Sequence, residues 1–136
     1  FKHVNDNHGH AVGDAALRLV ARCTRDTLRT RDVMGRVGGD EFMLLLPGAS
    51  VDDALHVADR ITRNLDLASK NFPLPLSLSF GLVQIHTGES LAAAQHRADL
   101  ALYEAKRQGR RRAVPARQDG PDTVFGESRS LGLDPL

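Results

Sequence analysis

The residues best suited to chemistry lie in one short stretch, residues 36–42, which reads Arg-Val-Gly-Gly-Asp-Glu-Phe. Two glycines between apolar runs of strand length predict a β-hairpin, because glycine enters the φ > 0 regions of a tight turn without a steric penalty. Asp40 and Glu41 follow Gly38 and Gly39 directly. A turn without side chains lets a bulky anion approach the backbone, and two carboxylates can offer oxygens to a hard cation such as Mg²⁺. On hairpin chemistry alone, an ordinary surface turn with solvated acids is the favoured alternative.

Two further groups of polar residues accompany this stretch. Residues 1–13 are rich in turn formers and contain three histidines, but no thiol or compact histidine pair indicates zinc. Lys106 and Arg110 lie where a helix is expected to end. Placement of cations against the negative end of the helix dipole is the simplest explanation for them.

Three amphipathic helices are expected to hold these residues in place. Asp14 is expected to cap the first, whose apolar stripe runs at three- and four-residue steps from Leu17 to Leu28. Ser50 begins a capping pattern for the second helix, and Ser90 opens the third.

The predicted strands are residues 32–37 and 42–46 on either side of the turn, residues 76–85, and a short strand at Val114. Residues 42–46 are apolar throughout, which indicates an interior strand covered on both faces. Gly81 indicates a bulge or a close approach of another segment to the backbone.

The order helix, hairpin, helix, strand, helix favours an α/β (α+β) fold in which a mixed central sheet carries helices. The first helix would need a strand before it, and that strand would lie upstream of Phe1. From Pro115 onward Pro, Gly, Asp and Ser dominate and apolar periodicity vanishes. We therefore expect a folded domain over residues 1–114 and a disordered tail over residues 115–136.

The composition is typical of one soluble globular domain, with 136 residues, 41% apolar and 26% charged. A net charge of +1 gives no case for nucleic acid or membrane binding. The single Cys23 excludes an internal disulfide and favours a reducing compartment such as the cytoplasm. No apolar run approaches the span of a bilayer, and no secretory signal opens the chain. A start at Phe1, within a motif-rich segment, indicates a piece of a longer protein.

Taken together, the motifs resemble the GGDEF domain of diguanylate cyclases, bacterial enzymes that condense two GTP molecules into the second messenger cyclic di-GMP. Each motif alone is weak, but their joint order and spacing are specific. The matching segments are Phe1-Lys2-x-x-Asn5-Asp6, Gly9-His10-x-x-Gly13-Asp14, Arg36-x-Gly38-Gly39-Asp40-Glu41-Phe42, Leu46-Pro47, Ser77-x-Ser79-x-Gly81 and Ala98-Asp99-x-Ala101-Leu102-Tyr103-x-Ala105-Lys106-x-x-Gly109-Arg110. The resemblance implies a ferredoxin-like, nucleotidyl-cyclase-like arrangement of the sheet.

The resemblance implies a binding site for GTP. A carboxylate would accept hydrogen bonds from the N1–H and N2–H₂ edge of guanine, and an amide would both donate and accept. Cations would contact the phosphates. The implied substrate-binding residues are Asn5, His10 and Asp14 at the base, Gly38 and Gly39 beside the nucleotide, and Lys2, Lys106 and Arg110 at the phosphates.

The resemblance also implies the chemistry. Asp40 would bind Mg²⁺, with Mn²⁺ as a possible substitute, and accept the proton of the attacking 3′-hydroxyl; Glu41 belongs to the same motif. The 3′-oxygen of one GTP would attack the α-phosphorus of the other and displace pyrophosphate. Because each domain would hold one GTP, the resemblance implies an antiparallel homodimer.

A regulatory site is implied just upstream of the hairpin. Arg29 and Asp32 would bind the product cyclic di-GMP and inhibit synthesis, with Arg60 as a secondary arginine. A local ion pair between Arg29 and Asp32 is the alternative.

The family's first metal ligand, an aspartate on the first strand, would lie before Phe1, so residues 1–136 alone are expected to be poorly folded and inactive. An upstream sensory domain is also expected. A catalytically silent domain that binds cyclic di-GMP or GTP is the main competing function. An RNA-binding ferredoxin-like domain that uses the arginines at 110–112 is a third, but only 4% aromatic residues argue against it.

Overall fold

The structure is a computed structural model and describes residues 9–116 and 125–133. Within these ranges the chain forms three helices and five strands. In chain order they are α2 (His10–Thr27), β1 (Val33–Gly38), β2 (Glu41–Pro47), α3 (Val51–Ala68), β3 (Leu78–Ile85), α4 (Leu91–Arg107), β4 (Ala113–Pro115) and β5 (Phe125–Leu133).

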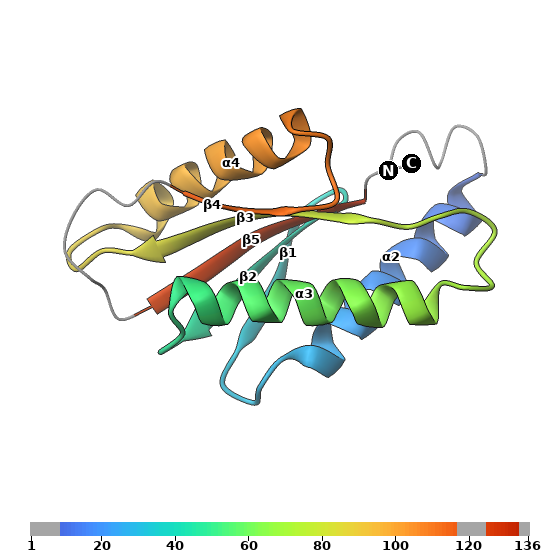
Figure 1. Cartoon of the computed structure of the whole chain (residues 1–136), viewed down its shortest axis with the longest axis horizontal. Helices are drawn as coiled ribbons and strands as arrows, with labels where there is room; N and C mark the ends of the chain where they lie inside the picture. Colours follow the sequence, from blue (N-terminus) through green and yellow to red (C-terminus); the bar gives the residue numbers. More distant parts are fainter. Residues whose placement is uncertain (1–8, 117–124, 134–136) are drawn as a thin grey trace.

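The strands form one sheet in the order β1-β2-β5-β3-β4. The β3–β4 pair is parallel and the other pairs are antiparallel. Helices α2 and α3 cover one face of the sheet and α4 covers the other (Figure 1). The predicted mixed sheet flanked by helices is confirmed.

The main core lies between the sheet and the α2–α3 pair. Phe42, Leu44 and Leu46 of β2 are buried there, together with residues of both helices such as Val20 and Ile61. The alternate β2 side chains, at positions 43 and 45, are only half-buried. The predicted interior position of β2 is confirmed by the strand order, but one face of the strand is only partly covered, because α4 packs mainly over β3.

The start of α2 differs from the prediction. The helix begins at His10, with Gly9 as N-cap at φ 85, so Asp14 lies inside the helix and is exposed. Gly9, five residues before the expected cap Asp14, takes the cap position, because glycine adopts the positive φ at no steric cost. Asp14 is thereby available for a role other than capping.

The starts of the other two helices agree with the prediction. The Ser50 hydroxyl accepts from the Asp53 backbone N–H at 3.1 Å, and the Asp53 carboxylate accepts from the Ser50 N–H at 3.0 Å. The hydrogen bond from the Ser50 backbone N–H to the carboxylate is the largest cause that lowers the pKa of Asp53. Ser90 accepts from the Ala93 N–H at 3.1 Å and caps α4.

The close approach predicted at Gly81 is confirmed. A Cβ at this position would lie 2.2 Å from the Ala98 carbonyl oxygen and 2.5 Å from the Leu102 nitrogen. Only a residue without a side chain lets α4 lie this near to β3.

Strand β5 overturns part of the predicted disordered tail. Residues 125–133 pair with both β2 and β3, and so lie in the middle of the sheet. By register Ser128 shares a row with the buried Leu44 and Leu82. Composition did not predict this strand, because the pairing of β5 with β2 and β3 uses backbone hydrogen bonds, which any non-proline residue can form. Residues 117–124 and 134–136 of the predicted tail lie outside the described residues.

Among the described residues, no helix combines the length and the apolar character that a membrane crossing requires.

Candidate active site

The β1–β2 hairpin carries the Gly-Gly-Asp-Glu stretch at its turn. Gly38 pairs with Glu41, so Gly39 and Asp40 form a two-residue turn. Gly39 has φ 40, whereas Gly38 belongs to β1 and needs no positive φ. A Cβ added at either glycine would meet no atom within 4 Å. The predicted hairpin is confirmed, and the space beside its turn is open.

Arg36 braces this turn from within. Its Nε and Nη2 atoms donate to the Gly39 carbonyl oxygen at 2.9 and 2.5 Å. These bonds fix the peptide group that leads into Asp40. Sequence analysis gave Arg36 no role, although an arginine three residues before the turn glycine was the available signal.

The two carboxylates stand at the boundary between this open turn and the core. Asp40 and Glu41 are partly exposed, while the next residue, Phe42, is 5% exposed and anchors β2. The backbone that carries the acids is therefore held by the core on one side and by Arg36 on the other.

A divalent cation suits these two carboxylates. No group of three or more His, Cys, Asp or Glu side chains able to hold a metal occurs among the residues that the structure describes. Mg²⁺ is usually bound through one or two carboxylates together with substrate phosphates and water. The donor set of Asp40 and Glu41 therefore fits an ion shared with a phosphate rather than a cage made of protein alone.

The other predicted substrate residues within the described ranges lie at the start of α2 and at or just after the end of α4. His10 and Asp14 are exposed and lie one turn apart on α2. Lys106 is half-buried in the last turn of α4, and Arg110 follows that helix with φ 64. Lys2 and Asn5 lie outside the described residues.

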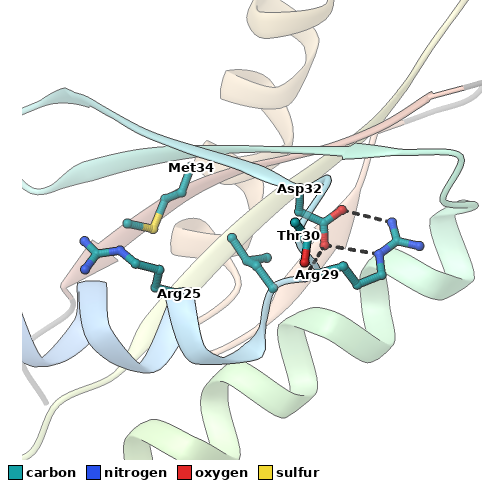
Figure 2. A pocket seen from close by; sticks show the side chains of 6 residues that line it. Arg25, Arg29, Thr30, Asp32 and Met34 are labelled. Carbon is teal, nitrogen blue, oxygen red and sulfur yellow. Dashed lines mark hydrogen bonds and ion pairs between the residues drawn. The ribbon is translucent and has the colours of Figure 1, made fainter.

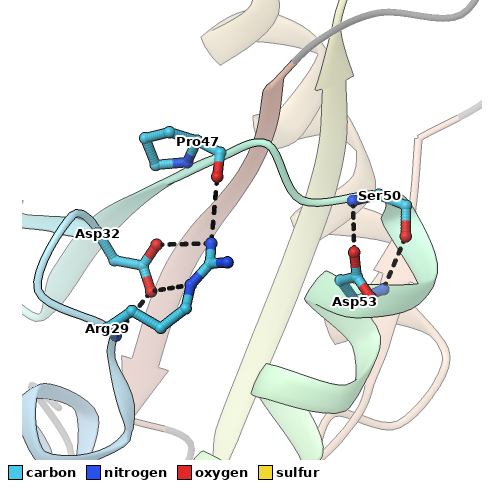
Figure 3. A network of polar contacts seen from close by, with 5 residues as sticks. All are labelled: Arg29, Asp32, Pro47, Ser50 and Asp53. Carbon is cyan, nitrogen blue, oxygen red and sulfur yellow. Dashed lines mark hydrogen bonds and ion pairs between the residues drawn. The ribbon is translucent and has the colours of Figure 1, made fainter.

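A second polar cluster lies at the opposite end of the hairpin, where β1 starts and β2 ends (Figure 3). The Arg29 guanidinium donates to both oxygens of Asp32, at 3.2 Å from Nε and 2.9 Å from Nη2, and the Arg29 backbone N–H donates to Asp32 at 2.8 Å. Arg29 Nη2 also donates to the Pro47 carbonyl oxygen at 3.1 Å. The Asp32 side chain is 1% exposed. The hydrogen bond to Asp32 is the main cause that raises the pKa of Arg29.

A surface cavity of about 430 Å³ opens beside this cluster (Figure 2). Its lining residues are Arg25, Leu28, Arg29, Thr30, Asp32 and Met34. Arg60, predicted as a secondary arginine of this site, is exposed on α3 and is not among them. Sequence analysis did not name Arg25 or Met34.

The comparisons with known proteins agree on one family. A family model described as the diguanylate cyclase GGDEF domain matches residues 1–112. Diguanylate cyclase DgcM of Escherichia coli is 38% identical over 116 residues, which cover 85% of this chain and 28% of that protein. Diguanylate cyclase TpbB of Pseudomonas aeruginosa is 42% identical over 115 residues, covering 81% and 26%. The chain thus spans well under half the length of these relatives.

Solved structures give the same result. The active GGEEF domain of a diguanylate cyclase from Vibrio cholerae matches with a TM-score of 0.77 at 34% identity, covering 87% of this chain and 77% of that one. Diguanylate cyclase SiaD from Pseudomonas aeruginosa, solved with its activator SiaC, matches with a TM-score of 0.73 at 36% identity, covering 85% and 45%.

Proposed function

Because the chain belongs to the GGDEF domain family of diguanylate cyclases, we propose that it condenses two molecules of GTP into cyclic di-GMP with release of pyrophosphate. The observation that carries the proposal is the intact Gly-Gly-Asp-Glu turn, braced by Arg36 and open on the side where a nucleotide would lie. A degenerate turn would have favoured a silent receptor.

Substrate binding would use residues from three parts of the chain. Asn5 and Asp14 would hydrogen-bond the guanine, with His10 beside them, because amide and carboxylate groups match its polar edge. The open backbone at Gly38 and Gly39 would let the triphosphate lie close to the turn. The phosphate contacts would come from Lys2, Lys106 and Arg110, since cations form strong charge-assisted hydrogen bonds with phosphate oxygens.

Asp40 would act at the reacting atoms, with Glu41 beside it. The Asp40 carboxylate would accept the proton of the attacking 3′-hydroxyl. The 3′-oxygen would then form a bond to the α-phosphorus of the second GTP, while the bond to pyrophosphate breaks. A Mg²⁺ or Mn²⁺ ion held by these carboxylates would neutralise phosphate charge and lower the pKa of the hydroxyl. Both GTP molecules must meet in one site, so the proposal includes a homodimer that brings two turns together.

The Arg29–Asp32 cluster would bind the product and inhibit synthesis. Its support is a preformed geometry: the arginine is oriented by three hydrogen bonds to a buried carboxylate and the Pro47 carbonyl, beside a cavity large enough for a small ligand. Arg29 also keeps its Nη1 group for a ligand, since the bonds to Asp32 and Pro47 use Nε and Nη2.

The direct test is to incubate the full-length protein with GTP and Mg²⁺ and to follow cyclic di-GMP and pyrophosphate. We expect both products from the unaltered protein. Absence of product together with tight binding of cyclic di-GMP would replace the enzyme with the silent receptor.

A further inference from the structure

The cavity at the end of α2 has cationic groups on two sides. In Figure 2 the Arg25 guanidinium lies on the Met34 side, whereas the Arg29 guanidinium lies beyond Asp32. Arg25 and Arg29 are four residues apart at the end of α2, yet their charged groups point in different directions. A ligand in the cavity would therefore have a cation within reach on each side.

The two arginines differ in the hydrogen bonds that their guanidinium groups already make. Arg29 is bonded to Asp32 and to the Pro47 carbonyl. The Arg25 guanidinium takes part in none of the ion pairs or side-chain hydrogen bonds found among the described residues, and Arg25 is exposed. The charge of Arg25 is thus available to a ligand without the loss of an existing contact.

The cavity surface between the cations is apolar. Leu28 and Met34 are both half-buried, pack against the main core and line the cavity. A methionine thioether is polarizable and makes favourable contacts with aromatic rings. A volume of about 430 Å³ lies in the usual range for small-molecule sites. The arrangement of cation, apolar floor and cation matches a ligand that carries two anionic groups and a flat aromatic ring.

We propose that Arg25 is a specificity-determining residue of this cavity, which binds a cyclic dinucleotide with one phosphate at Arg29, the other at Arg25 and a base over Met34. The inference rests on the product-binding role proposed above and adds to it the second cation. It also explains selectivity, because a mononucleotide has one phosphate group and cannot engage both arginines at once.

The test is calorimetric titration of the protein with cyclic di-GMP. Arg25→Ala should weaken binding roughly tenfold or more, the usual effect of losing a charge-assisted hydrogen bond. Arg25→Lys should recover part of that loss, and the dependence of the affinity on salt should become shallower in Arg25→Ala, which a purely structural role would not produce. GMP should bind weakly to every variant.

Arg22→Ala is the matched control. Arg22 is an exposed arginine one turn earlier on α2 that lines two other cavities, so its loss should leave the affinity unchanged. Thermal unfolding of each variant verifies that the fold persists.

The outcomes separate the two proposals. If Arg29→Ala abolishes binding while Arg25→Ala stays within about twofold of the unaltered protein, the role of Arg25 is refuted and the product site stands. If the unaltered protein turns over GTP but does not bind cyclic di-GMP, the product site itself is refuted, and the role of Arg25 with it.

Discussion

The two ends of the β1–β2 hairpin treat their acidic residues in opposite ways. At the turn, Asp40 and Glu41 remain partly exposed, and the nearest arginine bonds to a backbone carbonyl. At the base, Asp32 is buried and both of its carboxylate oxygens are taken by Arg29. The acids at the turn are thus partly exposed to solvent, whereas the acid at the base is buried and bonded to an arginine.

The difference follows from what each carboxylate must do. An acid that is to bind a metal ion or take a proton, as proposed for Asp40, has to face the substrate. The partial exposure of Asp40 and the ordered backbone beneath it agree with that proposal. An acid that orients an arginine must itself be immobile, since the desolvated pair keeps its geometry only when its hydrogen bonds are satisfied. Arg36 and Arg29 show these two uses of an arginine in the same hairpin.

The largest expected effect is on the accessible acids. Asp40→Ala should reduce cyclic di-GMP synthesis at least about 100-fold, because it removes both a metal ligand and the proton acceptor. The melting temperature should hardly change, since Asp40 is not part of the core. Product formation and thermal unfolding measure the two effects. Asp59→Ala is the control, because Asp59 is an exposed aspartate of α3 that forms an ion pair with the exposed Arg63. Near-normal turnover in Asp40→Ala would refute the role given to this residue.

The next largest effect is expected at the Arg29–Asp32 cluster. In Arg29→Ala, the concentration of cyclic di-GMP needed for half-inhibition should rise roughly tenfold or more. The turnover of GTP measured without added cyclic di-GMP should persist. It should also lower the melting temperature, because Asp32 is left buried without its cation. Inhibition curves at fixed GTP give the first quantity. Unchanged inhibition would remove this cluster from regulation and leave it as a structural ion pair.

The geometry of the turn gives a third, smaller effect. Gly39→Val should reduce stability by about 1–3 kcal/mol, because a β-branched residue is strained at the observed φ of 40. Turnover should fall severalfold as the peptide held by Arg36 shifts. Gly35→Ala in β1 is the matched control, since a Cβ there also meets open space but at an ordinary φ. Denaturant titration of the two variants isolates the backbone effect, and equal losses of stability would mean that the turn is not strained by a side chain.

The features predicted correctly from sequence are those with local causes. The Ser50 and Ser90 caps, the Gly-Gly turn and the close approach at Gly81 each depend on residues a few positions apart or on the lack of a side chain. The assignment of Asp14 to a cap failed because Gly9, five residues earlier, provides the cap.

The features that sequence analysis missed depend on contacts between distant segments. Strand β5 gains its place from pairing with β2 and β3, which its polar composition does not reveal. The bond from Arg29 to the Pro47 carbonyl spans 18 residues, and the cavity beside Arg29 depends on how the chain turns from the end of α2 into β1. Family spacing named Arg29 and Asp32, but only the folded chain shows which other residues share their cavity.

Glu89, outside the hairpin, is a second carboxylate whose two oxygens both accept hydrogen bonds from an arginine, as those of Asp32 do. Arg97 donates to both of its oxygens, at 2.8 and 2.7 Å, and to the Gln84 carbonyl. Mainly through the bond from Arg97, the pKa of Glu89 falls to about 2. In the unfolded chain Glu89 takes up its proton near the usual glutamate pKa, so its contribution to stability is complete above that value and is lost as pH falls toward about 2.

The smallest expected effect is on the pH dependence of stability, and acid unfolding of Glu89→Gln measures it. The free energy of unfolding of the unaltered protein should fall more steeply than that of the variant between about pH 4.5 and pH 2, because only the former has to protonate Glu89. Asp59→Asn is the control: its ion pair with Arg63 joins two well-exposed side chains and contributes little, so this variant should keep the steep fall. Parallel curves for Glu89→Gln and the unaltered protein would show that Arg97 does not hold this carboxylate as Arg29 holds Asp32.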